Sequence, residues 1–189
     1  EGHRWEYAKS GVDFIERALG LSPQSSIIDL GCGNGRISIE LAKRGHDVTG
    51  LDYSKYLLRV AKRKARSMGV RVDFVEGDMR KLGYKASFDA VVSWDGTFGF
   101  FFDEENADVV RGVARSLRPG GKYLVDLHNR DGYIIRHLGK KWHRRGDTLI
   151  LEDWRFDLST SRLIIEHEIR EPGRKPRRGV SVIREYTIT

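Results

Sequence analysis

The 189-residue sequence contains a single cysteine, Cys32, and no apolar stretch as long as the roughly 18 residues that a membrane-spanning helix requires. One cysteine excludes a disulfide framework within the chain. No N-terminal segment combines the basic, apolar and small-residue regions of a secretory signal. We therefore predict a cytoplasmic protein that has no membrane partner.

Asn and Gln are also scarce, whereas charged residues make up 32% of the chain. The amide residues are Gln24, Asn34, Asn106 and Asn129. This balance is typical of proteins from thermophiles. The net charge of +7 would attract anionic partners, although net charge alone indicates no specific ligand. The length and a hydrophobic content of 39% fit a single folded domain over residues 1–189.

Helical and strand-like patterns alternate over the first two thirds of the chain. Apolar residues at helical spacing predict helices over 10–19, 36–44, 55–68 and 103–117. Short apolar runs predict strands over 27–30, 47–51, 70–75, 88–94 and 122–127. Ser10 is the expected N-cap of the first helix, and Gly20 its stop. Strands separated by helices favour an α/β fold with a doubly wound, Rossmann-like parallel sheet.

The pattern changes after residue 128. A short helical piece at 133–138 precedes strand-like runs over 148–156, 162–169 and 179–188. The polar turn "DLSTS" at 157–161 predicts an antiparallel hairpin between the first two runs. The single domain would therefore consist of an α/β core over 10–130 and a C-terminal antiparallel strand extension over 131–189.

The stretch "SIIDLGCGNGR" at 26–36 places three glycines, Gly31, Gly33 and Gly35, between a strand and a helix. Glycines there admit positive φ and let a ligand approach the main chain closely. The turn lies at the carboxyl ends of the strands, where open α/β folds bind ligands. Asp52 ends the next strand, where a carboxylate can accept hydrogen bonds from ribose hydroxyls. The sequence thus predicts a ribose-containing ligand. A dinucleotide fingerprint would need a third glycine where Arg36 stands.

The motif "DLGCGNGR" at 29–36 resembles the first motif of class I S-adenosylmethionine-dependent methyltransferases. The segments "VEGDMRKL" at 75–82, "FDAVVSWDGTFGFF" at 88–101 and "LRPGGKYLVD" at 117–126 are similar to later motifs of that family, in the same order. The resemblance spans residues 10 to about 130. It implies an enzyme that uses S-adenosylmethionine as its cofactor.

The resemblance also implies which residues contact the cofactor. Asp78 would receive the adenine amino group, and Met79 would pack on the adenine ring. Trp94 could wall the methionine side of the cofactor or an aromatic or cationic acceptor, or it could be a core tryptophan. The whole implied set is Asp29, Gly31, Cys32, Gly33, Gly35, Asp52, Tyr53, Asp78, Met79, Ser93 and Trp94. We interpret Cys32 as a small buried side chain that fills space and does not act as a nucleophile. We predict no metal site. A simpler alternative is that Gly33 only makes a tight turn and that Asp52 acts with Ser54 at a helix start.

Methyl transfer from a sulfonium depends mainly on positioning and desolvation, and it needs a base only if the acceptor must lose a proton. Asp95 and His128 follow the fourth and fifth predicted strands and are the candidate catalytic residues. A structural or substrate-orienting role remains open for both residues.

The acceptor is less constrained. The motif Ser93-Trp94-Asp95-Gly96 lacks the Pro-Pro-aromatic sequence of enzymes that methylate base or glutamine amines, and no cysteine follows that strand for cytosine C5 chemistry. A small-molecule N or O acceptor is favoured, with Trp142, His143 and Trp154 as lid candidates. Small-molecule members complete the sheet with a further helix and two strands. Either this sheet is closed differently or C-terminal residues are missing, and we favour missing residues.

Two alternatives remain for the function. The basic segments "KKWHRR" at 140–145 and "RKPRR" at 174–178 could grip phosphates, which would make the protein an RNA methyltransferase. The chain could also be a nucleotide-binding module without catalysis, because a fold does not fix a function.

Overall fold

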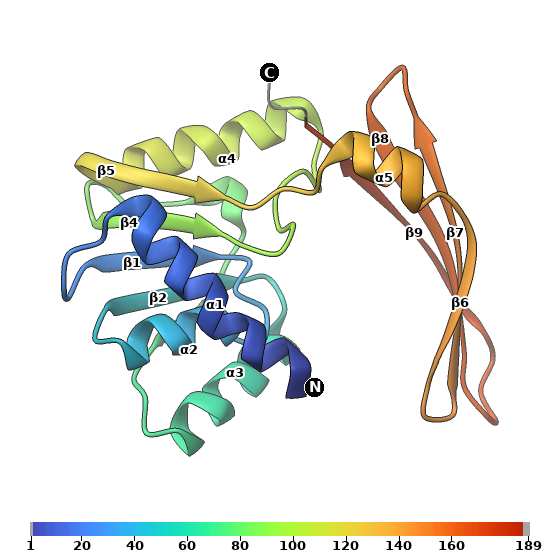
Figure 1. Ribbon diagram of the computed structural model, residues 1–189, viewed down its shortest axis with the longest axis horizontal. Helices are drawn as coiled ribbons and strands as arrows, with labels where there is room; N and C mark the ends of the chain where they lie inside the picture. Colours follow the sequence, from blue (N-terminus) through green and yellow to red (C-terminus); the bar gives the residue numbers. More distant parts are fainter. Residues whose placement is uncertain (1, 187–189) are drawn as a thin grey trace. The chain divides into compact units, whose positions relative to one another are not determined.

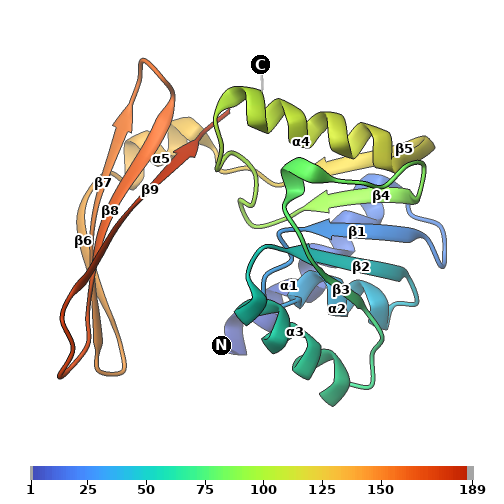
Figure 2. The same cartoon turned by 180° about the vertical axis from the view of Figure 1, so that it is seen from behind.

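The computed structural model describes residues 2–186, with side chains from residue 5 onward, as two compact units (Figures 1 and 2). The first, here called the parallel unit, comprises the chain up to Phe98 together with Glu104–Asp126. The second, the antiparallel unit, comprises Gly99–Asp103 and the chain from Leu127 onward. No helix within residues 2–186 is long and apolar enough to cross a membrane.

The parallel unit contains a five-stranded sheet of order β3-β2-β1-β4-β5, in which every neighbouring pair is parallel. Its strands are β1 (Ser26–Leu30), β2 (Asp47–Asp52), β3 (Asp73–Glu76), β4 (Phe88–Ser93) and β5 (Leu117–Val125). The strand order reverses between β1 and β4, so the loops after these two strands border the crevice where such sheets bind ligands. The predicted α/β, doubly wound fold is confirmed.

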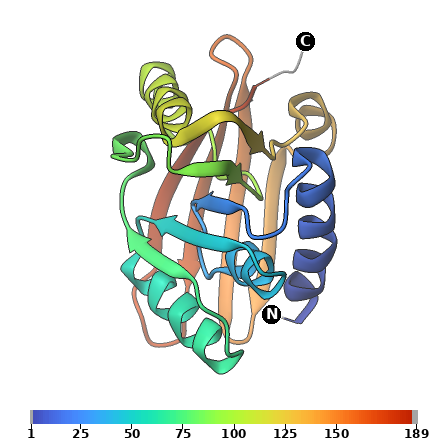
Figure 3. The ribbon, with the colours of Figure 1, turned by 90° about the vertical axis from the view of Figure 1, so that its left-hand side faces the viewer.

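Helices cover both faces of this sheet, and Figure 3 shows α1 and α4 on opposite sides of it. The helices are α1 (Gly2–Leu19), α2 (Arg36–Lys43), α3 (Lys55–Ser67) and α4 (Asp103–Ser116), with a single 3₁₀ turn, η1 (Met79–Lys81). One apolar core joins α1 and α2 to the sheet. It contains Ala8, Val12, Ile15, Leu19, Ile27, Ile37, Leu41, Val48, Ala90 and Val92. A second core joins α2, α3 and β3 through Ile39, Leu58, Ala61, Ala65 and Phe74.

The first helix begins earlier than predicted. Ser10 lies inside α1, where its hydroxyl donates to the carbonyl of Tyr7 at 3.1 Å, so its predicted role as N-cap is wrong. The apolar spacing continues upstream through Ala8, which is buried, and this extends the helix toward the N-terminus. Gly20 follows the last helical residue with a φ of +60°, as the predicted stop requires.

Two strand boundaries also differ from prediction. β3 begins at Asp73 rather than at residue 70. β5 begins at Leu117 rather than at residue 122, so the strand includes Pro119, Gly120 and Gly121. Its register against β4 shifts between Phe88 and Ala90, and such a bulge lets a strand accommodate residues that do not fit the regular ladder.

The antiparallel unit contains a four-stranded sheet of order β6-β7-β8-β9 and one short helix. Its elements are α5 (Arg130–Arg136), β6 (Gly139–Arg145), β7 (Thr148–Asp157), β8 (Arg162–Arg170) and β9 (Arg177–Arg184). The predicted hairpin between the first two strand-like runs is confirmed as β7 and β8. The predicted last strand extended to residue 188, and residues 187 and 188 lie outside the described residues.

Strand β6 was missed because its sequence, "GKKWHRR", has a composition that is poor in strand-forming residues. It pairs with β7 over its whole length, from Gly139 opposite Trp154 to Arg145 opposite Thr148. The two residues between the strands, Gly146 and Asp147, form a tight turn, and Gly146 has a φ of +58°. A glycine-containing two-residue turn is the signal that could have revealed this hairpin.

Candidate functional site

The loop Gly31–Gly35 joins β1 to α2 at the carboxyl end of the parallel sheet. Gly31, Gly33 and Gly35 have φ values of +71°, +55° and +80°, which confirms the predicted need for glycine. A Cβ atom on Gly31 would lie 2.9 Å from Thr97 Cβ, and one on Gly35 would lie 2.8 Å from Phe74 Cζ. A Cβ on Gly33 would meet no atom within 4 Å. Two of the glycines therefore permit tight packing, whereas Gly33 faces open space.

The carboxylate of Asp52 holds this loop. Its Oδ2 accepts a hydrogen bond from the Gly33 amide at 2.8 Å, and its Oδ1 accepts one from the Ser54 amide at 2.7 Å. Ser54 caps α3 by accepting from the Leu57 amide at 3.3 Å. The simpler role of Asp52 at a helix start is thus present in the geometry. It leaves room for a ribose, because each carboxylate oxygen can accept a second hydrogen bond.

A cavity of about 250 Å³ lies beside this loop within the parallel unit. Several of the predicted residues line it: Asp29, Gly31, Cys32, Gly33, Trp94 and Asp95. A neighbouring hollow of about 230 Å³ shares Arg36, Ile37, Trp94 and Asp95 with it and adds Tyr7 and Ala8 of α1. The glycine loop, the loop after β4 and the start of α1 therefore border one crevice.

Two of the lining residues are buried ionisable groups. Asp29 is 2% exposed and accepts a hydrogen bond from the Ser38 hydroxyl at 2.6 Å. Burial raises the pKa of Asp29 to about 6, since desolvation disfavours the charged carboxylate. Burial also raises the pKa of the Cys32 thiol far above its usual range. A thiol that stays protonated is inert as a nucleophile, in keeping with its interpretation as a filler.

The candidate base Asp95 is held by two contacts. Its Oδ2 lies 2.6 Å from Nη2 of Arg36, and its amide donates to Asp126 Oδ2 at 2.9 Å. Asp95 also has a φ of +64°, a conformation that is uncommon for residues other than glycine. Sequence reasoning missed Arg36 as a partner, although it had noted that Arg36 replaces the third glycine of a dinucleotide fingerprint. A proton taken up by Asp95 would neutralise the carboxylate that forms the ion pair with Arg36.

Six predicted cofactor residues are not among those that line the 250 Å³ cavity: Gly35, Asp52, Tyr53, Asp78, Met79 and Ser93. Tyr53 is 81% exposed, and the Ser93 hydroxyl instead bonds Tyr123 Oη at 3.0 Å. Asp78 precedes Met79 at the start of η1 and accepts hydrogen bonds from its neighbour Arg80, including one from Nη2 at 2.7 Å. This pairing holds the pKa of Asp78 below its usual range.

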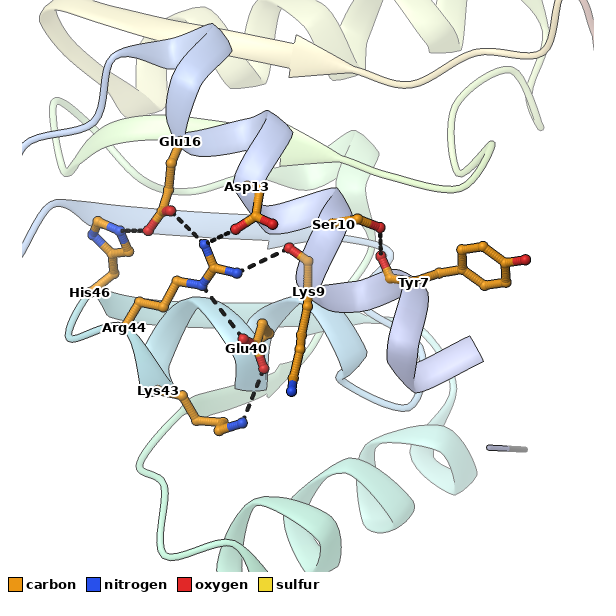
Figure 4. Close-up of polar contacts among 9 residues, drawn as sticks. All are labelled: Tyr7, Lys9, Ser10, Asp13, Glu16, Glu40, Lys43, Arg44 and His46. Carbon is orange, nitrogen blue, oxygen red and sulfur yellow. Dashed lines mark hydrogen bonds and ion pairs between the residues drawn. The ribbon is translucent and has the colours of Figure 1, made fainter. Parts of the chain in front are cut away.

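A network of charged groups fixes α1 against the chain around the end of α2 (Figure 4). Arg44 Nη1 lies 2.6 Å from Asp13 and 2.7 Å from Glu16, and its Nη2 donates to the Lys9 carbonyl at 3.0 Å. The buried His46 lies 3.1 Å from the same Glu16 through Nε2. Since Tyr7 and Ala8 belong to α1, this network helps to fix the α1 wall of the crevice.

The second candidate base, His128, belongs to the antiparallel unit. Its Nδ1 lies 3.7 Å from Oε1 of Glu185, and its ring centre lies 4.7 Å from that of Tyr133. Tyr133 in turn stacks on Trp154, with ring centres 5.8 Å apart and an interplanar angle of 10°. The structure thus brings together His128 and one lid candidate. Sequence reasoning missed Tyr133, which lies in the adjacent α5, and Glu185, which is distant from His128 in the sequence.

The other two lid candidates, Trp142 and His143, lie on β6. Trp142 is 71% exposed on β6. His143 Nδ1 lies 4.0 Å from Oε2 of Glu152, and that oxygen also accepts from Trp154 Nε1 at 3.2 Å. His143 therefore belongs to a second histidine–glutamate contact on the same sheet.

The parallel sheet that reverses between β1 and β4, the glycine turn and the acid after β2 define the fold of the class I S-adenosylmethionine-dependent methyltransferases. The family model of a methyltransferase domain matches residues 27–121, about half of the chain. The chain belongs to this family, and its cofactor is S-adenosylmethionine.

Named relatives include enzymes with different acceptors. The cypemycin N-terminal methyltransferase of a Streptomyces species is 37% identical over 102 residues, which cover 53% of this chain and 41% of that protein. The ubiquinone biosynthesis O-methyltransferase of Alkalilimnicola ehrlichii is 31% identical over 135 residues, which cover 69% of this chain and 53% of that protein. This chain spans about half the length of the curated relatives it matches.

The fold is also that of solved methyltransferase structures. The crystal structure of an S-adenosylmethionine-dependent methyltransferase from Clostridium acetobutylicum superposes with a TM-score of 0.79 and covers 96% of this chain and 75% of that chain. Its sequence identity is 17%, so this likeness concerns the fold alone.

Proposed function

We propose that the protein transfers a methyl group from S-adenosylmethionine to a nitrogen or oxygen atom of a small-molecule acceptor. The observation that supports the proposal most directly is the cavity beside Gly33. Gly33 has no side chain and faces open space, and its amide donates to the carboxylate of Asp52. A ribose can enter there without displacing protein atoms and can share the oxygens of Asp52.

The remaining cofactor contacts follow from this placement. The methionine part of the cofactor would lie along Trp94, which lines both hollows of the crevice. Asp78 would bind the adenine amino group through an oxygen that Arg80 also contacts. The sulfonium would then be held in a partly apolar site, where desolvation favours transfer of its methyl group.

The acceptor assignment rests on the relatives and on the missing motifs. One relative is named as a ubiquinone biosynthesis O-methyltransferase and another as a cypemycin N-terminal methyltransferase, so relatives of this chain are named for different acceptors. The sequence after β4 lacks the motif of base amine methylation. Asp95 or His128 would take up the acceptor proton if the acceptor has to lose one before attack.

The RNA alternative is weakened by charge pairing in one basic segment. Arg174 and Arg177 lie 3.0 Å and 3.4 Å from Glu171, and Arg178 lies 2.7 Å from Glu168. Side chains that are already paired with carboxylates are less available for phosphates. We therefore favour the small-molecule reading.

The first test measures S-adenosylmethionine binding by calorimetry for the wild-type chain and for Asp52→Ala. We expect about 10- to 100-fold weaker binding, because the substitution removes charged hydrogen bonds to the loop and to the ribose. Asp47→Ala is the matched control, since Asp47 is an exposed aspartate at the opposite end of the same strand. Unchanged affinity in Asp52→Ala would contradict the ribose assignment.

A second measurement identifies the acceptor class. Labelled S-adenosylmethionine is incubated with the protein and a bacterial lysate, which is then split by a small-pore filter with and without ribonuclease. Label is expected in a filtrate compound that chromatography separates from unreacted S-adenosylmethionine. Ribonuclease-sensitive label in the retained fraction would instead establish an RNA acceptor, and label in retained protein would establish a polypeptide acceptor.

A further inference from the structure

The first helix of the parallel unit carries exposed aromatic side chains that the proposed cofactor contacts do not use. Tyr7 is 69% exposed and Phe14 is 50% exposed. Both belong to α1 and lie two helical turns apart, so they share one face of the helix with Gly11 between them. Single exposed apolar side chains are common, but neighbouring ones often mark a binding groove. Tyr7 also lines the hollow of about 230 Å³ beside α1.

Gly11 lets the indole of Trp94 pack directly on α1. A Cβ atom on Gly11 would lie 3.2 Å from Cζ2 and 3.3 Å from Cε2 of Trp94. Phe14 flanks the same indole, with ring centres 6.1 Å apart and an interplanar angle of 50°. Glycine inside a helix is destabilising relative to alanine. The close approach of the indole therefore gives a physical reason for glycine at this position.

The hollow beside α1 is lined by two aromatic side chains. Tyr7 and Trp94 both border it, and Ala8 and Ile37 add apolar surface. Figure 4 shows the ring of Tyr7 pointing away from the charged network that fixes α1. Aromatic rings attract one another when their centres lie about 4.5 to 7 Å apart. A planar ring is therefore a fitting occupant for this hollow.

The charged residues that line the hollow, Arg36 and Asp95, are already paired with each other. Nη2 of Arg36 lies 2.6 Å from Oδ2 of Asp95. An ionic acceptor would have to compete with this ion pair. A neutral hydroxyl or amino group can donate to Asp95 without breaking the pair, because a carboxylate accepts several hydrogen bonds. The lining thus favours an uncharged acceptor with a polar substituent.

The size and the position of the hollow limit the acceptor further. A cavity of about 150 Å³ is large enough to bind benzene. A hollow of about 230 Å³ therefore suits one ring with small substituents. The hollow shares Arg36, Trp94 and Asp95 with the 250 Å³ cavity in which we propose that the cofactor binds. A ring in the hollow would lie next to the methyl donor, as transfer requires.

We propose that this hollow is the acceptor subsite and that the methyl acceptor is an uncharged, single-ring aromatic compound with a hydroxyl or amino group. Tyr7 and Trp94 hold the ring and determine specificity, and Asp95 accepts a hydrogen bond from the polar group of the acceptor. All three residues belong to the parallel unit. This inference deepens the proposed function and rests on it.

The test follows the indole N–H signal of Trp94 in ¹H–¹⁵N spectra of the full chain labelled at tryptophan. Trp94→Phe identifies this signal among those of the four tryptophans. The chain is saturated with S-adenosylhomocysteine, the product that has no methyl group to donate, and is titrated with catechol, phenol or aniline. The matched probe is trans-1,2-cyclohexanediol, which carries two hydroxyls on a ring without an aromatic face. We expect a saturable shift with the aromatic probes and none with the diol.

Substitutions at Tyr7 test whether its ring contributes to binding. Tyr7→Leu keeps an apolar side chain but removes the ring, and it should weaken catechol binding about 5-fold. Tyr7→Phe keeps the ring and should change binding less than about 2-fold. Tyr56→Leu is the matched control, because Tyr56 is also exposed but belongs to α3 and does not line either hollow. It should bind catechol as the wild-type chain does.

Several results would overturn the inference. They are an unmoved Trp94 signal with all three aromatic probes, equal binding of the diol, and unchanged catechol binding in Tyr7→Leu. Calorimetry with S-adenosylhomocysteine on the same samples separates this inference from the proposed function. If the cofactor product fails to bind, the proposed function fails. If it binds and the Trp94 signal stays in place, the acceptor subsite alone is wrong.

The labelled product of the lysate experiment gives a second readout. After chromatography, the labelled compound of the filtrate should absorb in the near ultraviolet, as an aromatic ring does. Its yield should fall in Tyr7→Leu and stay unchanged in Tyr56→Leu. A labelled small molecule without aromatic absorption would overturn the proposed substrate class while leaving methyl transfer to a small molecule established.

Discussion

The two units of the chain differ most in where their apolar side chains lie. The parallel unit has many fully buried aliphatic residues, among them Ile15, Ile27 and Leu41, each 0% exposed. In the antiparallel unit, the buried apolar side chains among the described residues are Leu163 and Ile165. Its strands present mostly half-exposed and charged residues. One unit is built around a core and the other around a hydrogen-bonded ladder.

This difference has a functional side. The glycine loop that borders the cofactor cavity is packed against the core through Phe74, Ala61 and Thr97, so its shape depends on that core. The groups singled out in the antiparallel unit, His128, Tyr133 of α5 and Trp154 of β7, are partly exposed and lie in a unit with few buried apolar side chains. Cofactor geometry is therefore under strict packing constraint, whereas the side chains of the antiparallel unit can vary at small cost in stability.

The largest effect on the packed core of the parallel unit is expected from a substitution at Gly35. Gly35→Val should destabilise the chain by about 4 to 5 kcal/mol, because the new side chain meets Phe74 and Ala61 and the φ of +80° is strained for a β-branched residue. Gly33→Val is the matched control, with open space around its Cβ. It should keep the fold, at a cost of about 1 to 3 kcal/mol, and lose S-adenosylmethionine binding.

Urea unfolding and calorimetry on both glycine variants check this prediction. A stable Gly35→Val chain would contradict the packing role of the loop. A folded Gly33→Val chain that still binds the cofactor would contradict the open approach to the main chain.

Truncating one large side chain in each unit tests whether the difference in burial between the units is also a difference in unfolding free energy. Leu41→Ala should cost about 3 to 4 kcal/mol, since Leu41 is fully buried in the core of the parallel unit. Trp142→Ala should cost less than about 0.5 kcal/mol, since Trp142 is mostly exposed on β6. Urea unfolding measures both values, and equal losses would show that the antiparallel sheet depends on Trp142 for packing.

A smaller effect concerns the pH dependence of the parallel unit. The folded-state pKa of Asp29 is raised from the ordinary value of 3.8 to about 6, so the folded chain binds this proton more tightly than the unfolded chain. The resulting stabilisation is fully present below about pH 4 and is lost as the pH rises through about 6. The shift corresponds to about 3 kcal/mol.

Asp29→Asn tests this dependence because its amide oxygen can still accept from the Ser38 hydroxyl. The free energy of unfolding of the wild-type chain, minus that of the variant, should fall by about 3 kcal/mol between pH 4 and pH 7. Taking the difference removes the contributions of the other carboxylates. A difference that stays constant over this range would mean that Asp29 titrates normally.

Much of the parallel unit could be predicted from the sequence because its signals are local. The positive φ values of the glycine loop and the position of Asp52 at the end of β2 follow from spacing along the chain. The contacts that sequence reasoning missed connect distant positions. Arg36 and Asp95 are 59 residues apart, and the ion pair between them could not be predicted from spacing along the chain.

In the antiparallel unit, the predictable features were the hairpin and the strands rich in branched residues. The pairing of β6 escaped because lysine and arginine carry no strand signal of their own. The contact between His128 and Glu185 joins the beginning and the end of the unit and depends on the sheet that lies between them. Its discovery requires the folded arrangement.

The order β6-β7-β8-β9 leaves β6 and β9 as the two edges of an open sheet. Every exposed edge offers backbone donors and acceptors to which a strand of another chain could attach. β6 carries Lys140, Lys141, Arg144 and Arg145, and β9 begins with Arg177 and Arg178. Lysine and arginine side chains on edge strands disfavour pairing between copies of a chain, so the basic residues that suggested nucleic acid binding have a second physical consequence at these edges.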